Sequence, residues 1–396
     1  MRAFAGGYYN NLKAMYDYLG VKYHSQPFLF EFAKAQKGAV RPGTSERDRP
    51  YFIHASNLHQ MPPPRPSTVA TIAYLTEVLY LIACYTWFSL CCSLVAPRTV
   101  PDGEYGGVSE SLDGYLRRIR LSRYFINCYL LPLISSVSTC PHESLLAFPA
   151  SDVIEYKRRT HGAPHYTVSN GVNTVQNTLI KDIEYELSAA VSAIEPLNNG
   201  VKISWRKIDR GGRTHEEFFD RVVLAVAPDI VGAIFEPLKH FMARIPTTVV
   251  ESIVHTDWNS LGVEAKRVNI KDSGAQLIYL RTSEDGASKT ESLHIQPCGA
   301  IVTTCPFSPI DPCLTIHSAK FTRVLRSPES RKIINGIFGG TQELYGNEKS
   351  IPLWKNGQDN VWLVGGWCWD GMVLLEGCVL SAVRVADAFG VHVPWR

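Results

Sequence analysis

The most constraining feature of this sequence is a short apolar strand near the C-terminus that ends at two glycines and leads into a helix. Residues 361–364 predict the strand, and Gly365 and Gly366 form the turn. Small residues on one face predict a helix at 374–389, which Gly390 would end. Such a turn lets the backbone approach a flat ligand, and the helix start directs N–H groups at ligand oxygens. A strand and helix whose glycines serve only packing would show the same pattern, so both interpretations remain open.

The helix opens with the run Leu375, Glu376, Gly377, Cys378 and Val379. This run resembles the C-terminal flavin motif of the FAD-dependent amine oxidase and phytoene desaturase superfamily, in which a strand ending in small-Gly-acid precedes a helix that opens Glu-Gly-Ala-Val. The resemblance implies that the turn meets the ribityl and pyrophosphate part of FAD. It also implies that N–H groups at the helix start face the pyrimidine edge of the flavin. At the position of the acid, this sequence has Gly366.

Other segments resemble the same superfamily in the same order along the chain. Residues 4–12 and 18–21 look like the segment that follows the first Rossmann unit, and residues 255–257 and 302–317 are similar to parts of bacterial and fungal predicted NAD/FAD-binding proteins of the amine oxidase type. The resemblance covers nearly the whole chain except residues 62–106. It implies a mixed α/β (α+β) fold, in which a Rossmann-like FAD/NAD(P)-binding domain of amine oxidase type is interleaved with a substrate domain.

The resemblance divides the chain into three parts. Residues 1–60 and 141–230 would form a partial FAD-binding domain with a β-meander, residues 61–140 and 231–350 the substrate domain, and residues 351–396 the C-terminal FAD-binding strand, turn and helix. The family begins with a strand, a Gly-x-Gly-x-x-Gly turn and a helix that hold the ADP half of FAD. The 396 residues contain no such motif, so the chain is expected to be an N-terminally truncated member.

Alternating apolar and polar residues at 190–220 predict a three-stranded β-meander. It turns at Asn199 and Gly200 and leads to a buried strand at 221–226. In the family the meander extends from the FAD domain, and the residue that matches Val191 holds the adenine through its backbone. An accessory sheet without a ligand would show the same alternation.

The resemblance implies cofactor-binding residues but no catalytic residue. The implied cofactor is FAD, and the implied residues are Val191, Gly365, Gly366, Leu375, Glu376 and Cys378. No lysine has the context of the one that amine oxidases often place near the flavin N5 atom. Trp367 and Trp369 are candidates for an aromatic wall beside the substrate and, equally, for the core. A flavin needs little from the protein beyond orientation and electrostatics, so oxidation is not excluded.

Two functions remain open. The first is flavin-dependent oxidation or desaturation of an apolar, lipid-like small molecule, with hydride passing from the substrate to FAD. The alternative is a non-catalytic remnant or interaction module without tight FAD, which Gly366 and the missing glycine motif support. A hydrolase with Cys305 as nucleophile and His255 as base is weakly supported, because no oxyanion or nucleophile-elbow motif accompanies these residues.

Residues 69–96 form an apolar stretch whose only charge is Glu77. The stretch is longer than the roughly 20 residues that span a bilayer as a helix. It fits a spanning helix, a helix that dips into the membrane beside a substrate entrance, or a buried helix of the substrate domain. A span would separate residues 1–66 from 98–396, which the resemblance places in one fold. Glu77 facing lipid would also cost about 2.5 kcal/mol, so we expect membrane contact without crossing.

Charge and cysteine content exclude other classes of protein. A net charge of +3 argues against a nucleic-acid partner, and the local cluster Arg117, Arg118, Arg120 and Arg123 suits a solvated helix face or a headgroup contact. The ten cysteines include no Cys-x-x-Cys pair and are expected to be buried, reduced thiols. Pro164 prevents His161 and His165 from sharing a helix face, so no metal is expected. With no apolar core of signal type at 1–16, the sequence predicts an intracellular protein.

The sequence also predicts the structure of the segments that precede the meander. Apolar residues at helical spacing predict a helix at 110–133 in the substrate domain, whereas the charges at 153–166 predict a loop. Asn170 and Gly171 mark a turn that resembles the one before the helix preceding the second FAD strand.

Overall fold

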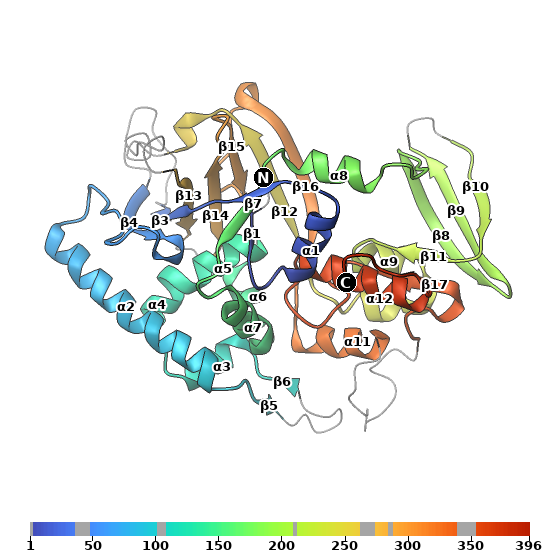
Figure 1. Cartoon of the computed structure of the whole chain (residues 1–396), viewed down its shortest axis with the longest axis horizontal. Helices are drawn as coiled ribbons and strands as arrows, with labels where there is room; N and C mark the ends of the chain where they lie inside the picture. The colour runs from blue at the N-terminus through green and yellow to red at the C-terminus, as the bar shows by residue number, and fades with distance from the viewer. Residues whose placement is uncertain are drawn as a thin grey trace.

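The structure is a computed structural model. It describes residues 3–35, 48–100, 108–208, 212–261, 274–283, 288–338 and 354–396. Helices and sheets alternate along the chain, so the mixed α/β class predicted from the sequence is confirmed. A large sheet with a helical layer forms one part of the molecule, and a β-meander with a small parallel sheet forms the other (Figure 1).

The large sheet has seven strands in the order β16-β12-β15-β14-β13-β3-β4. Strands β3 and β13 are parallel, and the other neighbours are antiparallel. Two strands come from the first 60 residues, which the sequence analysis assigned to the flavin-binding part. The bounds are β3 (Phe28–Ala35), β4 (Asp48–Ala55), β12 (Thr247–His255), β13 (Gln276–Thr282), β14 (Thr290–Ile295), β15 (Ile301–Thr304) and β16 (Thr315–Val324).

A layer of helices packs against this sheet, with α5 in contact with β13 and β14 (Figure 1). The predicted continuous helix at 110–133 is wrong in one respect. Arg120 has a left-handed φ of 54°, which breaks the helix after α3. The elements are α2 (Thr71–Leu94), β5 (Thr99–Val100), β6 (Val108–Ser109), α3 (Leu112–Arg118), α4 (Arg123–Phe125), a π-helical turn (Ile126–Leu130), α5 (Leu131–Ser138), α6 (His142–Leu146) and α7 (Ala150–Thr160).

The loop predicted at 153–166 is wrong. Residues 153–160 belong to α7, and the chain then enters β7 (His165–Val168). Val153 and Ile154 are fully buried on one side of α7, while its basic residues lie in the last turn, where the helix dipole favours them. The charges therefore mark one end of an amphipathic helix.

The second part of the molecule contains the meander and the C-terminal unit. The predicted meander is confirmed as three antiparallel strands, β8 (Ala189–Leu197), β9 (Gly200–Lys207) and β10 (His215–Phe219). The strand that follows, β11 (Val222–Leu224), pairs in parallel with β17 (Val361–Leu363). The predicted C-terminal helix is α12 (Leu375–Ala388).

The N-terminal elements link the two parts. A small antiparallel sheet has the order β1-β7-β2, with β1 (Ala3–Ala5) and β2 (Tyr23–Ser25). Helix α1 lies beside α12 although the two are at opposite ends of the chain (Figure 1). The remaining helices are α1 (Asn10–Tyr18), α8 (Val172–Leu179), α9 (Pro228–Ile234), α10 (Lys239–Met242) and α11 (Pro328–Phe338).

Helix α2 is, within the described ranges, the one helix long and apolar enough to cross a membrane. It has 24 residues, and an 18-residue stretch of it has a mean hydropathy of 1.5 with 17% of the stretch buried. The buried-helix alternative is therefore wrong, because most of α2 faces outward. Figure 1 shows α2 along the outer edge of the molecule.

A buried carboxylate ties the start of α3 to the segment after α2. Glu110 accepts hydrogen bonds from the Arg98 N–H (3.0 Å) and from Nε (2.9 Å) and Nη2 (2.7 Å) of Arg118. The Arg118 guanidinium holds the pKa of Glu110 below its ordinary value. This contact therefore stabilises the fold fully above the ordinary glutamate pKa of about 4.3, and the contribution is lost as the pH falls through the lower, folded-state pKa.

We expect Glu110→Gln to lower the free energy of unfolding by about 1.5–3 kcal/mol at pH 7, because two charge-assisted hydrogen bonds are weakened. The difference from the parent protein should shrink in acid, where Glu110 is protonated. Urea unfolding at pH 7 and pH 3 measures both values. Glu155→Gln, which removes an exposed pair with Arg159, serves as control and should cost about 0.5 kcal/mol or less. A difference that stays constant with pH would contradict the assignment.

Candidate cofactor and active site

The C-terminal turn is fastened to the helix that follows it. Gly365 has a φ of 148°, and its N–H donates to the Ser381 hydroxyl over 2.9 Å. That hydroxyl in turn donates to the Gly377 carbonyl at 2.7 Å. Ser381 is buried on α12, and these two hydrogen bonds join the glycine turn to this helix. In the sequence, Ser381 is one of the small residues that predicted the helix at 374–389.

Protein packing accounts for the glycines of this motif. A Cβ atom at position 377 would lie 2.3 Å from the indole of Trp369, and one at position 366 would lie 3.0 Å from the Leu374 carbonyl oxygen. Neither position leaves room for a side chain without movement of its neighbours. The glycines are thus explained without a ligand, and their spacing alone does not demonstrate a cofactor.

The two tryptophans of the loop have different surroundings. Trp367 is 3% exposed and lies in the core with β11 and β17, where its indole N–H donates to the Val226 carbonyl over 3.0 Å. Trp369 is half-buried, and its indole N–H donates to the Met372 carbonyl over 3.0 Å. The Trp369 ring lies 6.1 Å from that of Tyr8. Of the two candidates for an aromatic wall, Trp367 is placed in the core, and Trp369 remains a candidate.

The side chain of Glu376 serves the start of α1. The carboxylate is 1% exposed and accepts hydrogen bonds from the Asn11 N–H (2.9 Å), the Asn11 side-chain amide (2.6 Å) and the Leu12 N–H (3.0 Å). These N–H groups lie in the first turn of α1, where a helix has unpaired donors and a positive dipole end. Any contact of Glu376 with a cofactor would therefore have to come from its backbone.

The other residues implied by the resemblance lie in two places. Leu375 and Cys378 are half-buried in the first turn of α12, whose N-cap, Leu374, makes no side-chain capping hydrogen bond. Val191 is 39% exposed on β8, the edge strand of the meander. Strand β8 contacts the short turn Gln358–Asn360 that precedes β17, so the meander adjoins the C-terminal unit.

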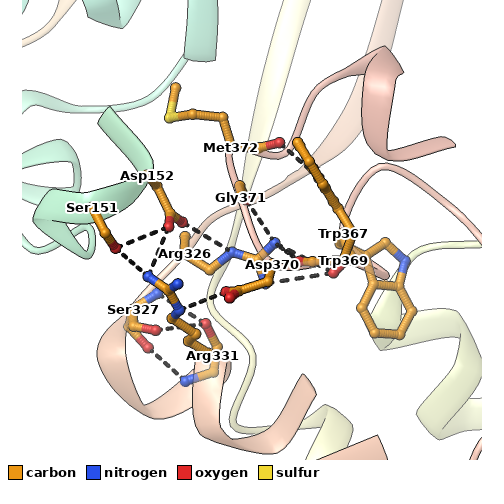
Figure 2. Close-up of polar contacts among 11 residues, drawn as sticks. Ser151, Asp152, Arg326, Ser327, Arg331, Trp367, Trp369, Asp370, Gly371 and Met372 are labelled. Atoms are coloured by element: carbon orange, nitrogen blue, oxygen red, sulfur yellow. Dashed lines mark hydrogen bonds and ion pairs between the residues drawn. The ribbon is translucent and has the colours of Figure 1, made fainter. Parts of the chain in front are cut away.

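A buried charged cluster holds the loop between the glycine turn and α12 (Figure 2). Arg326, 1% exposed, donates to the carbonyls of Trp369 (2.9 Å) and Gly371 (3.0 Å). Its Nε lies 3.7 Å from Oδ2 of Asp152 on α7. Arg331 on α11 contacts the other oxygen of Asp152 (2.9 Å) and Asp370 of the loop (2.6 Å). Three distant segments thus fix the path of residues 367–371.

Burial and charge act in opposite directions within this cluster. Burial raises the pKa of Asp152, while Arg331 and Arg326 lower it. Burial likewise lowers the pKa of Arg326, and Asp152 raises it. The facing atoms Asp152 Oδ2 and Arg326 Nε form no hydrogen bond within the described ranges, so their contact is purely ionic. Sequence reasoning missed these residues, because no motif joins them and Asp152 adjoined a predicted loop.

The structure separates Cys305 from His255. The Asp257 N–H donates to His255 Nδ1 (3.2 Å), which leaves the proton on Nε2 to be donated to Thr303 (2.7 Å). His255 pairs with Ile301 across the sheet, whereas Cys305 lies opposite Glu251, four residues away on β12 and hence about 13 Å along the strand. Burial lowers the pKa of His255 and raises that of Cys305. The pair therefore cannot act as nucleophile and base.

These contacts allow the fit of FAD to be tested. The start of α12 lacks a side-chain cap and follows a turn in which Gly365 is left-handed, and these features suit the flavin end of the cofactor. The chain has no glycine-rich motif for the ADP end and no acid at Gly366. The residues therefore match one half of FAD. Among the described residues, no group of three or more His, Cys, Asp or Glu could hold a metal ion.

No family model matches the sequence, and comparison with curated proteins gives no match. Among solved structures, a fatty acid isomerase from P. acnes that produces CLA is similar, with 10% identity and a TM-score of 0.55 over 99% of this chain and 86% of that one. A triple mutant from a redesign of cofactor binding in putrescine oxidase has 11% identity and a TM-score of 0.51, over 98% and 86% of the two chains. Cyclohexylamine oxidase from Brevibacterium oxydans IH-35A has 11% identity and a TM-score of 0.49, over 98% and 87%.

Similarities at this level of identity show the fold. The isomerase and the putrescine oxidase, whose TM-scores exceed 0.5, match this chain over nearly its whole length. The chain therefore has the fold of these two enzymes, which is the amine oxidase-like fold that its motifs resemble.

Proposed function

We propose that this chain is a flavin-dependent oxidoreductase of the amine oxidase type, which transfers hydride from an apolar small molecule to FAD. The observation that carries the proposal is the uncapped start of α12 beside Gly365 and Gly366, in a fold shared with an oxidase and an isomerase. When bound, the flavin would supply the hydride acceptor. The protein would have to bind the flavin, orient the substrate beside it and shield both from water.

Each part of the cofactor would have its own contact residues. The N–H groups of Leu375 and Glu376 at the start of α12 would face the flavin end, since the first N–H groups of a helix have no partner within it, and Cys378 lies in the same first turn. The turn at Gly365 and Gly366 would lie along the ribityl chain. The backbone of Val191 on the outer strand of the meander would contact the adenine.

Two buried contacts would keep this arrangement rigid. Arg326 fixes the loop that carries Trp369, so the indole is held beside the start of α12. Glu376 fixes α1 against α12, which brings the aromatic residues after β1 toward the same loop. Preorganised surroundings of this kind orient a substrate and exclude water.

The small parallel sheet of β11 and β17 is relevant to how the ADP half of the cofactor would be bound. In the described ranges β11 pairs with β17 alone, and Val223 of β11 is 43% exposed. Parallel sheets are normally larger and covered on both faces. A further parallel strand that ends in a glycine-rich turn would extend this sheet and hold the pyrophosphate.

Flavin absorbance tests the proposal. We would purify this chain alone and together with any in-frame sequence upstream that encodes a Gly-x-Gly-x-x-Gly unit. We expect the longer protein to be yellow and to bleach anaerobically with substrate, because both halves of FAD are then held. Flavin in the shorter chain as well would mean that the start of α12 and the meander suffice. Colourless protein in both cases, folded by circular dichroism, would contradict the proposal.

The colourless outcome would favour the second function, a non-catalytic interaction module. Three observations support it specifically. The acid of the turn is replaced by Gly366, the glycines at 366 and 377 are explained by packing, and the Glu376 carboxylate is occupied by α1.

Bleaching of the flavin in the same yellow protein would also identify the substrate class. The similarity to a fatty acid isomerase and the exposed apolar face of α2 support a lipid-like substrate, whereas the similarity to putrescine oxidase supports an amine. Bleaching by a fatty acid and not by putrescine would decide for the first class.

A further inference from the structure

Helix α2 exposes a continuous apolar face. Ile72 is 82% exposed, Leu79 is 68% exposed and Leu94 is 79% exposed. Positions three, four or seven residues apart lie on one side of a helix, so these residues form a single stripe. The large apolar residues of the exposed face are Ile72, Leu75, Leu79, Ile82, Tyr85, Trp87, Leu90 and Leu94.

The polarity of α2 is inverted relative to that of a surface helix in a water-soluble protein. Its only charged residue, Glu77, points toward the protein and accepts a hydrogen bond from the Tyr129 hydroxyl. The opposite face, which such a helix normally fills with charged residues, carries none. An exposed apolar patch of this length marks a surface that another apolar phase covers.

Side-chain contacts hold α2 flat against the protein along its length. The Tyr80 hydroxyl donates to Ser122 over 2.6 Å, and the Trp87 indole N–H donates to the Ile119 carbonyl over 2.8 Å. At the C-terminal end, Arg158 of α7 donates to the Cys92 carbonyl, while Phe88 is buried beneath the helix. A helix held on one side in its middle and at its C-terminal end presents its other side to a surface, and it does not cross a membrane by itself.

Basic residues border this face. Arg65 donates to the Val69 carbonyl just before α2 (2.8 Å), and exposed Arg98 follows it. Lys157 lies 4.6 Å from the ring of Tyr85. Beside the middle of the helix, the segment that contacts Tyr80 and Trp87 carries the exposed residues Arg117, Arg120 and Arg123. Among the described residues, Asp113 is paired with both Arg117 (2.7 Å) and Arg123 (3.3 Å), and Glu110 is paired with Arg118 (2.7 Å).

We propose that α2 docks on the surface of a bilayer that contains anionic phospholipids, with its axis parallel to the surface and its apolar stripe among the acyl chains. The basic border supplies the charge complementarity, since each Lys or Arg near an anionic surface strengthens binding about fivefold. The arrangement is that of an interfacial helix. This inference stands on α2 and its neighbours and is independent of flavin binding.

Vesicle sedimentation tests the apolar stripe. We expect the protein to bind vesicles of phosphatidylcholine with phosphatidylglycerol, and Leu75→Glu/Leu79→Glu to lower the partition coefficient at least about 100-fold, because burying each leucine contributes about tenfold or more. The matched control is Phe218→Glu on the meander, where Phe218 is 68% exposed and distant from α2. It should bind as the parent does. Equal binding of both variants would overturn the proposal.

Three further measurements test the charge and the mode of contact. Arg120→Glu/Arg123→Glu should weaken binding to the anionic vesicles more than tenfold and leave the weak binding to pure phosphatidylcholine unchanged. Protein that stays with vesicles after an alkaline carbonate wash would instead indicate a spanning helix. A dimer in lipid-free buffer that Leu75→Glu/Leu79→Glu dissociates, with no vesicle binding by the parent, would indicate that a second copy covers the stripe. Either result would overturn the proposal.

Discussion

Replacing Arg326 with methionine is expected to lower the free energy of unfolding by about 3–5 kcal/mol, the range for removing one partner of a buried ion pair. The variant leaves the Trp369 and Gly371 carbonyls without their donor at 2.9 and 3.0 Å. It also leaves Asp152, whose carboxylate is 1% exposed, with Arg331 as its remaining cationic contact. Urea unfolding at pH 7, followed by circular dichroism, measures the loss.

The matched control for this prediction is Arg244→Met. Arg244 pairs with Glu329 over 2.9 Å, but both side chains are partly in solvent, so the loss should be about 1 kcal/mol or less. Arg326→Lys keeps the charge but not the planar fork and should lie between the two. It also provides a measurable variant if the methionine form does not fold. Equal losses for Arg326→Met and Arg244→Met would show that the buried cluster does not hold the loop.

The cluster around Arg326 also shows where sequence reasoning stops. Arg326 follows β16, Asp152 lies on α7 and the carbonyls belong to the C-terminal loop, so no short-range pattern connects them. The charges at 153–166 predicted a loop, whereas residues 153–160 belong to the amphipathic helix α7. The buried positions of α7 could have been found from the apolar pair Val153 and Ile154, but its ion pairs depend on the tertiary fold.

Elements set by local chemistry were predicted well. The helix expected at 374–389 is observed at Leu375–Ala388, since small residues and Gly390 define its packing face and its end. The apolar stretch 69–96 contains α2 at Thr71–Leu94. The meander followed from strand alternation and a tight turn at Gly200. Each of these signals lies within a few residues of the structure that it specifies.

The candidate site was predicted only in part, for a physical reason. Its motif at 365–378 can be recognised from the sequence, but the partner of each side chain cannot. Trp367 and Trp369 were equivalent in the sequence, and the Val226 carbonyl and the surrounding core distinguish them. Gly377 suggested a ligand, yet the indole of Trp369 occupies the space that a side chain would need. Long-range contacts decided each case.

Glu376 provides the second large effect. We expect Glu376→Gln to lower the free energy of unfolding by about 3 kcal/mol in protein freed of flavin. The carboxylate accepts hydrogen bonds from two backbone N–H groups and one amide of α1, whereas the glutamine amide would direct its own N–H groups at some of these donors. A buried donor left without an acceptor costs about 1–3 kcal/mol. Urea unfolding of the apoprotein measures the change.

The control for Glu376 is Glu143→Gln, an exposed glutamate in the first turn of α6, where the interaction with the helix dipole is worth about 1 kcal/mol or less. If Glu376 served FAD alone, its substitution would leave the flavin-free protein as stable as the parent. That result would contradict the structural role assigned to Glu376. If the expected loss is found, the glutamate of the C-terminal motif acts first by joining α1 to α12. Loss of flavin from the variant would then follow from displacement of α1, and Asn11→Ala, which removes one of the three contacts and leaves Glu376 intact, should reproduce part of it.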